Sequence, residues 1–461
     1  MLRVVMMTSG EEVLSLSETS LEDLAKAGKD HARGLKEHLA LLTGHTRFRQ
    51  RLLRGDDILS DSTKLDSPSV LHLVLLSFCP PDDSHLLEFA AALAVDNANV
   101  VEAFLQIPCD PNLSLNVGIT FLSMASQHGS LNAAKLLLEA RADISKPDSH
   151  AGRMPLHWAC ARGHAELVRC LLESRADASR AWSHGEMRLT PLHLASATGH
   201  TEASQVLIDA DAAIDSAAHS TGVTPLWSAC VAGQVATARL LIEAGADVNK
   251  STLDGTTPLI VASKENQVEV VRLLIRFKAD KDHVAASGLS ALHVASTLGH
   301  VDVLHSLLTI GADIEAASPM GARPLHMACV AGHMEAVRLL IRQRANPHHA
   351  DRQGVTPLMT ACCTGRADLA QLLVQAGADS NHGTMVQGNR TDIFPLHVAC
   401  YNGDAEIAQV LVNGRADLTA STSQGLTPMD IARAHEHHNV TELLEAAQER
   451  PRRRRRVKGP P

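Results

Sequence analysis

One short pattern recurs along most of this 461-residue chain at a nearly constant spacing. It is close to Thr-Pro-Leu-His, and its third position is used here as the anchor of each copy. The anchors are Leu122, Leu156, Leu192, Leu226, Leu259, Leu292, Leu325, Leu358, Leu396 and Met429. The gaps between them are 34, 36, 34, 33, 33, 33, 33, 38 and 33 residues, and a weaker copy around Phe89 lies another 33 upstream. A period of about 20 to 50 residues is typical of stacked repeat architectures, so this spacing restricts the fold more than any other feature.

Within one copy the residue types predict two short helices. In residues 323–346, Pro324 suits the first position of a helix, where its missing N–H is not needed. Gly332 then ends the first helix. The second helix has an apolar side formed by Ala336, Val337, Leu339, Leu340 and Ile341. In a central copy we expect Leu240, Leu241 and Ile242 to be buried from both sides in the same way.

This unit resembles the ankyrin repeat, and the resemblance covers residues 84–448 with about eleven copies that are degenerate at both ends. It implies an α-solenoid of helix-turn-helix units with projecting β-hairpin fingers. It also implies protein binding on the concave surface formed by the fingers and the first helices. Polar terminal copies are expected to cap the stack. The low aromatic content of 2% fits such a core of small aliphatic side chains.

The turn after the second helix departs from the family pattern. Its glycine is present at Gly245, Gly311 and Gly377. In other copies the same position holds Arg141, Arg175, Asp211, Lys278, Arg344 and Arg415. If these residues adopt the left-handed conformation, each costs about 1 kcal/mol, which roughly additive repeat energies can absorb.

Residues 1–78 do not repeat and have a strand–strand–helix–strand–strand pattern. LRVVMM and VLSL predict a hairpin, ARGLKEHLALLTG a helix, and RFRQRLL and VLHLVLL two further strands. The order of these segments resembles ubiquitin, which implies a small β-grasp (α+β) domain with residues 17–31 as an insertion. The resemblance places the partner-binding apolar patch of ubiquitin on Leu53, His72 and Val74, without a match for its member in the first hairpin. It implies contact with ubiquitin-receptor modules, whereas the missing di-glycine argues against conjugation.

The sequence gives no sign of enzymatic chemistry or of a cofactor. Walker, G-x-G-x-x-G, H-E-x-x-H and G-x-S-x-G patterns are missing from it. Most of the 26 histidines occupy two repeat positions, where we expect structural hydrogen bonds. These are His157, His193, His293, His326 and His397 in the anchor motif, and His164, His200, His300 and His333 after the glycine. The group His435, His437 and His438 lacks the i, i+4 spacing of a helical metal site, so no metal is expected.

Five of the nine cysteines lie four residues after an anchor, in a position that holds serine in other copies. They are Cys160, Cys230, Cys329, Cys362 and Cys400. First helices stacked about 8–10 Å apart are too distant for disulfides, which fits a reducing compartment.

No apolar run is long enough to span a membrane, and a secretion signal is not evident. We expect a cytoplasmic protein, with the nucleus as an alternative location, and we expect the chain to be monomeric.

Residues 449–461 form a basic tail, predicted to be disordered. Its positive charges are Arg450, Arg452, Arg453, Arg454, Arg455, Arg456 and Lys458. With these seven charges set aside, the net charge of the remainder changes from −9 to −16. Three interpretations stay open: a nuclear import signal, a solvated or self-docking charge run, and contact with nucleic acid or another anionic surface.

Two copies have lengthened fingers, because the gaps into Leu192 and Leu396 are 36 and 38 residues. Insertions in repeat arrays often lie on the binding face. The first finger, residues 178–189, contains Trp182 and Met187, and the second, residues 380–393, contains Met385 and Arg390. Because these residue types are common interface anchors, we predict an exposed Trp182 as a binding hot spot. The alternative is that both extensions are tolerated without function.

These features together predict a non-enzymatic scaffold or adaptor that binds a protein partner through its repeats and links it to recognition of the ubiquitin-like domain. One alternative is a structural repeat scaffold in which the β-grasp domain is only a cap. Another is a substrate adaptor of the ubiquitin pathway. Nucleic acid is expected to bind, if at all, through the tail.

Overall fold

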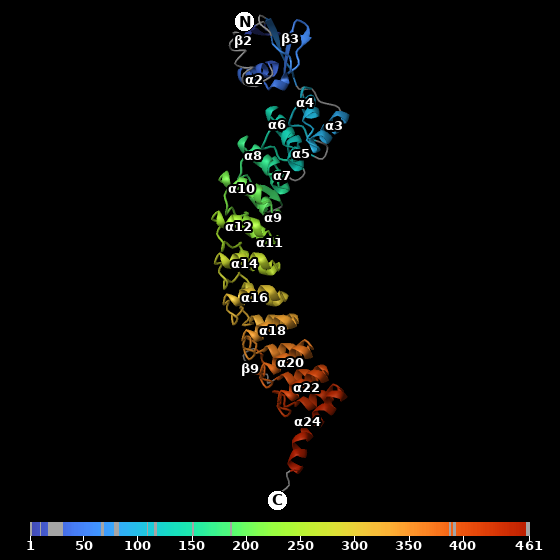
Figure 1. Ribbon diagram of the computed structural model, residues 1–461. Coiled ribbons are helices and arrows are strands. Elements are labelled where there is room, and N and C mark those ends of the chain that lie inside the picture. The colour runs from blue at the N-terminus through green and yellow to red at the C-terminus, as the bar shows by residue number, and fades with distance from the viewer. Residues whose placement is uncertain are drawn as a thin grey trace. The chain divides into compact units, whose positions relative to one another are not determined.

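The computed structural model describes residues 2–9, 11–16, 31–65, 69–77, 83–107, 109–114, 118–149, 152–184, 187–386, 389–390 and 393–457. The chain divides into two compact units, Met1–Ser220 and Thr221–Pro461, and each is described by itself. Figure 1 labels their helices and strands. Residues 17–30, which make up most of the expected insertion, lie outside the described part of the chain.

The first unit begins with one mixed five-stranded sheet. Its order is β2-β1-β5-β3-β4, in which the neighbours β1 and β5 are parallel and the other pairs antiparallel. The strands are β1 (Leu2–Met6), β2 (Glu12–Leu16), β3 (Gln50–Arg54), β4 (Asp57–Ile58) and β5 (Ser69–Leu75). Helix α2 (His31–Thr43) packs on one face, and the short η1 (Arg47–Arg49) leads into β3. Leucines alternating along the strands meet the helix in a core of Leu2, Leu35, Leu39, Leu52, Leu71 and Leu73. This topology is compatible with the expected β-grasp pattern.

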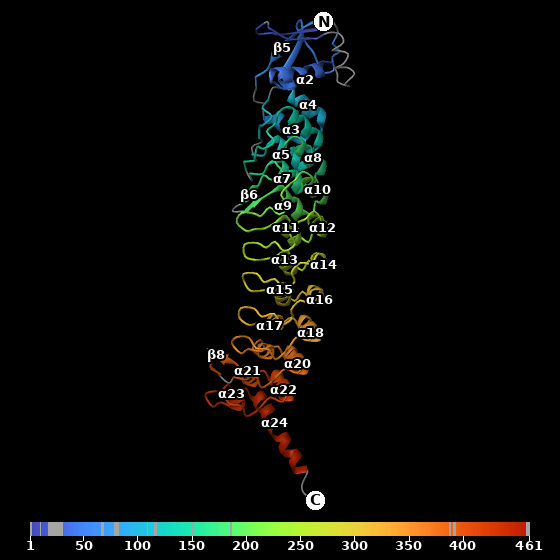
Figure 2. The same ribbon diagram turned by 90° about the vertical axis from the view of Figure 1, so that its left-hand side faces the viewer.

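In the described part of the first unit, four helix pairs follow the sheet. They are α3 (Asp83–Ala94) with α4 (Ala98–Leu105), α5 (Phe121–His128) with α6 (Leu131–Glu139), α7 (Pro155–Arg162) with α8 (Ala165–Glu173), and α9 (Pro191–Thr198) with α10 (Thr201–Asp209). Figure 2 shows the first helices α5, α7 and α9 in one row and α8 and α10 in another. The hairpin of β6 (Trp182–His184) and β7 (Met187–Leu189) lies beyond the row of first helices.

Seven further pairs lie among the residues that the structure describes in the second unit. The first helices are α11 (Pro225–Val231), α13 (Pro258–Lys264), α15 (Ala291–Leu298), α17 (Pro324–Ala331), α19 (Pro357–Cys363), α21 (Pro395–Asn402) and α23 (Pro428–Ala434). The second helices are α12 (Val235–Glu243), α14 (Val268–Arg276), α16 (Val301–Thr309), α18 (Met334–Arg342), α20 (Ala367–Gln375), α22 (Ala405–Asn413) and α24 (His438–Val457). Strands β8 (Met385–Val386) and β9 (Asn389–Arg390) form the second lengthened finger.

Local chemistry explains why each helix starts and stops where it does. At α11 the Thr224 hydroxyl accepts the Trp227 N–H at 3.1 Å, and Pro225 occupies the first helical position. At the end of α17, Gly332 has φ of 76°, a conformation that suits glycine. The expectation that Leu240, Leu241 and Ile242 are all buried was wrong for two of them: Leu240 and Ile242 are only half-buried, whereas Leu241 is fully buried. Because a helix turns by about 100° per residue, the two residues on either side of Leu241 are turned further from the core than Leu241 is.

The six side-chain-bearing residues at the glycine position of the turn do adopt the left-handed conformation. Their φ angles lie between 57° and 69°, at Arg141, Arg175, Asp211, Lys278, Arg344 and Arg415. Asn266 and Glu436 also have positive φ, and they occupy the position between the two helices that holds glycine in other copies. The chain therefore carries repeated backbone strain that the packed helices stabilise.

Helix α24 extends to Val457, so the backbone of residues 449–457 is helical where the sequence predicts disorder. The helix is anchored by Val440 and Leu444, whose side chains are buried. Arginine is a good helix former, which favours continuation from this anchored start. The side chains beyond Glu449 are outside the described part, so the three interpretations of the tail stay predictions.

Candidate protein-binding surfaces

In the second unit, apolar side chains are exposed in one column on the first helices. Val330, Cys363 and Tyr401 each lie five residues after an anchor, on α17, α19 and α21. These three helices pack against one another in sequence. Val330 is 63% and Tyr401 61% exposed, and Cys363 is exposed too. Sequence reasoning missed this column, although a signal was present: the equivalent residues of other copies include Gln127, Lys264 and Thr297.

The first lengthened finger forms the hairpin of β6 and β7, but its tryptophan is not on the surface. Trp182 is only 3% exposed, so the prediction of an exposed hot spot was wrong. The reason is that its indole ring packs against the Arg153 guanidinium, 4.2 Å from the ring centroid. Met187 begins β7, and its side chain lies outside the described part of the chain.

The second lengthened finger is a two-stranded ribbon in which Met385 pairs with Arg390. The sequence therefore placed both residues correctly on one hairpin. Their side chains are not among those that the structure describes, so their role in binding remains a prediction.

The outer face of the N-terminal sheet, opposite α2, brings together the three predicted patch residues. Leu53 pairs directly with His72 across β3 and β5, and Val74 lies two residues further along β5. All three are half-buried. Three exposed apolar residues nearby were missed by the sequence reasoning. They are Met7 after β1, Ile58 opposite Leu53, and Val70 on β5, with 59%, 65% and 48% exposure.

The N-terminal sheet domain contacts the first repeats through a buried arginine. Arg47 is 1% exposed. Its Nη1 donates to Asp61 Oδ2 at 2.6 Å, its Nη2 lies 2.8 Å from Glu102 Oε1, and its Nε donates to Glu139. Burial opposes ionisation of Asp61, but Lys36 and Arg47 outweigh it and lower the pKa of that carboxyl. No sequence pattern signalled this arrangement, because the partners lie up to 92 residues apart.

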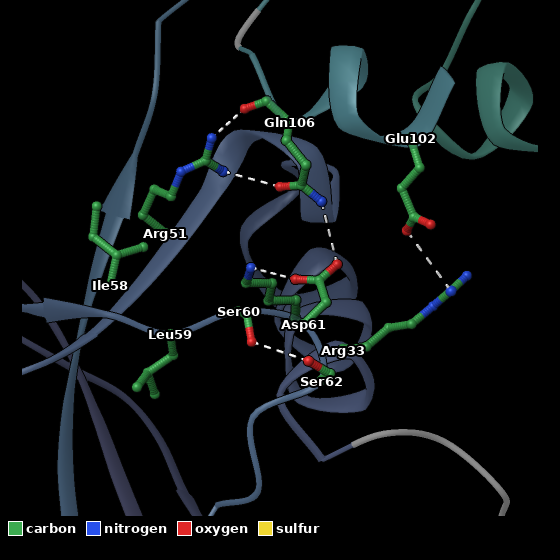
Figure 3. A pocket seen from close by; sticks show the side chains of 10 residues that line it. Arg33, Arg51, Ile58, Leu59, Ser60, Asp61, Ser62, Glu102 and Gln106 are labelled. Atoms are coloured by element: carbon green, nitrogen blue, oxygen red, sulfur yellow. Dashed lines mark hydrogen bonds and ion pairs between the residues drawn. The ribbon is translucent and has the colours of Figure 1, made fainter. Parts of the chain in front are cut away.

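A cavity of about 540 Å³ lies beside this cluster (Figure 3). Lys36 Nζ donates to Asp61 Oδ1 at 2.5 Å, and Arg51 donates to Gln106 Oε1 at 3.2 Å. Arg33 lies 3.8 Å from Glu102. Because these groups pair with one another, they hold the junction together, and we assign the cavity no ligand.

The histidines of the anchor motif have structural roles. The backbone N–H of Arg323 donates to Nδ1 of His326 at 3.2 Å, and Nε2 lies 3.2 Å from the carbonyl oxygen of Val355 in the next finger. Burial lowers the pKa of His326, and it lowers the pKa of His157 to about 4. His333, which follows the glycine between helices, bonds similarly to the Thr297 carbonyl at 3.1 Å. His326 and His333 therefore connect adjacent repeats.

The five cysteines of the small-residue position are buried and free. Burial raises the pKa of Cys329 and Cys400 to about 12, so these thiols stay protonated. Within the described part of the chain, no group of three His, Cys, Asp or Glu residues is placed to hold a metal ion. A search of the same residues found no helix of the length and apolarity that crossing a membrane requires.

Comparison with known families agrees with this architecture. Family models for ankyrin repeats match residues 87–181, 181–252, 244–318 and 307–384, and a further ankyrin model matches 380–432. The chain belongs to the ankyrin repeat family. The prediction of ankyrin repeats is thereby confirmed, and with it the coarse function, since ankyrin repeats are protein–protein interaction scaffolds and generally not enzymes. No curated protein matches the chain of this ankyrin repeat protein.

Proposed function

We propose that this ankyrin repeat protein is a non-enzymatic adaptor that binds a protein partner on its first helices and fingers. The carrying observation is the column of Val330, Cys363 and Tyr401, which exposes apolar area on three adjacent helices. Aromatic side chains are common anchors of interfaces, and Tyr401 is the single tyrosine of the chain. Exposed apolar fingertips in the same unit, Leu253 at 74% and Met320 at 67%, add to the available surface.

Affinity capture with the full-length chain tests this proposal. We expect the proteins captured by the natural chain to be lost with V330E/Y401E. A matched control is L41E/L87E, which places the same charges at exposed leucines of the first unit, 84% and 69% exposed. Equal capture by both double variants would show that the column is not the binding surface.

We further propose that residues 1–78 are a ubiquitin-like domain that engages ubiquitin-receptor modules. The strand order, the parallel pairing of β1 and β5, and the Leu53–His72 pair support this proposal. Met7 supplies an exposed apolar side chain after the first strand, where the sequence had no match. Titrating the full-length chain into 15N-labelled receptor modules should shift their resonances. Leu53→Ala should abolish the shifts and Leu41→Ala should not.

The alternative function of the N-terminal domain is that of a cap on the repeats. It is favoured by the Arg47 contacts to Glu102 and Glu139, which tie the sheet domain to α4 and α6. An absence of resonance shifts with several receptor modules, together with folding of the two parts in one transition, would support this cap function.

A further inference from the structure

The first lengthened finger encloses a positively charged groove. A cavity of about 500 Å³ opens beside β6 and β7. Pro147 and Ala181 provide accessible apolar surface next to the buried Trp182 and Met154, and Arg180, Ser183 and Arg188 provide polar groups. Of the described residues that line it, none carries a carboxylate. The groove is therefore basic at its rim and apolar in its interior.

The groove is held rigid by stacked side chains beneath the finger. The Arg153 guanidinium lies 4.2 Å from the Trp182 ring centroid and 4.7 Å from that of Trp158. Trp158 Nε1 donates to the buried Asp148 carboxylate at 2.9 Å, which ties the stack to the preceding finger. Backbone pairing of Trp182 with Leu189 fixes the hairpin itself. Such pre-organisation lowers the entropic cost of binding.

Two arginines at the rim are available to a ligand. Arg180 and Arg188 are exposed, and neither forms an ion pair with any residue that the structure describes. Arginine binds carboxylates through paired, charge-assisted hydrogen bonds. A long polyanion such as nucleic acid is a poorer match, because it needs many phosphate contacts and the chain has a net charge of −9.

We propose that the β6–β7 finger binds an acidic peptide segment of a protein partner. Arg180 and Arg188 hold its carboxylates, and an apolar side chain of the peptide contacts Pro147 and Ala181 beside the buried Trp182. This inference rests on the proposed scaffold function and adds the chemistry of one partner segment. It also gives Trp182 a different role from that of an exposed anchor: the indole forms the floor of the groove.

Fluorescence anisotropy with the full-length chain tests the proposal. The probe is a fluorescein-labelled 12-residue peptide of alternating Glu and Leu, compared with a Lys–Leu peptide and a 12-nucleotide single-stranded DNA. We expect binding of the Glu–Leu peptide only, and a loss of affinity of about tenfold or more in R180E/R188E. The control R169E/R239E makes the same charge change at exposed residues of α8 and α12 and should alter affinity less than about twofold.

The proposal is overturned if the Glu–Leu peptide does not bind at about 1 mM, or if both charge-reversed variants bind it equally. Comparable binding of the DNA through the same arginines would overturn it in favour of a polyanion site. Circular dichroism confirms that each variant is folded. If R180E/R188E still captures the partners that V330E/Y401E loses, the scaffold function stands and only the proposed binding of an acidic peptide in the groove fails.

Discussion

Replacing Arg47 with methionine tests whether the buried charge cluster stabilises the junction between the N-terminal domain and the repeats. The guanidinium contacts Asp61, Glu102 and Glu139, and it lies 4.1 Å from the centroid of the Phe48 ring. Methionine keeps most of the apolar length of the side chain, so the substitution removes the charge and its hydrogen bonds with little loss of volume.

The magnitude follows from the burial of the partners. Breaking a buried ion pair by removing one partner costs about 3–5 kcal/mol. Here the carboxylates of Asp61, Glu102 and Glu139 are 20%, 32% and 31% exposed, so water can replace part of the lost interaction. Lys36 also remains bonded to Asp61. We therefore expect a loss of roughly 2–4 kcal/mol in the free energy of opening at the junction.

Hydrogen exchange followed by mass spectrometry measures this free energy locally. Peptides covering α2, β3 and α6 should exchange about thirtyfold faster or more in Arg47→Met. The control Arg3→Met removes an exposed pair with Glu12, whose side chains are 55% and 37% exposed, and should cost less than about 1 kcal/mol. Unchanged or slower hydrogen exchange in Arg47→Met would refute the reasoning. It would mean that the cost of removing these charged groups from water equals or exceeds the attraction between Arg47 and its carboxylate partners.

Four further predictions concern the repeats and the tail. Leu241→Ala should lower the free energy of unfolding by about 3–5 kcal/mol in urea titrations, because its side chain is fully buried. Leu444→Ala, in the last helix pair, should mainly accelerate hydrogen exchange in α24. Equal urea midpoints for the two variants would contradict this prediction. Arg344→Gly should raise the urea midpoint, because about 1–2 kcal/mol of strain is relieved against about 0.4–1 kcal/mol of added unfolded-state freedom. Burial lowers the pKa of His157 to about 4, so the folded state disfavours protonation of this imidazole. The free energy of unfolding should therefore fall as the pH drops from about 6.5 towards 4. H157Q should flatten the dependence of the urea midpoint on pH between pH 7 and 5, and the same pH dependence in the variant and the natural chain would contradict this prediction. If the tail is a nuclear import signal, replacing residues 452–456 with serine should move a fluorescent fusion of the full chain from nucleus to cytoplasm, and unchanged imaging would exclude that interpretation.

The helices and turns were predictable because their causes are local. Pro225 and Thr224 start α11, and Gly332 ends α17, each through its own backbone chemistry. The strain at Arg344 was also foreseen, since the repeat period aligned it with glycines of other copies. The resemblance to ubiquitin placed Leu53 and His72 in one patch, and the structure pairs these two residues across β3 and β5.

The sequence by itself thus determined the ankyrin period, the helix boundaries and the strained turns, because each depends on residues a few positions apart. Only the tertiary structure decided the fate of Trp182, which is buried because Arg153 from the preceding finger packs on its ring. The same holds for Arg47 and Glu139, 92 residues apart, and for the column from Val330 to Tyr401. These arrangements depend on which side chains, distant in sequence, come into contact once the repeats stack, and no local sequence pattern predicts those contacts.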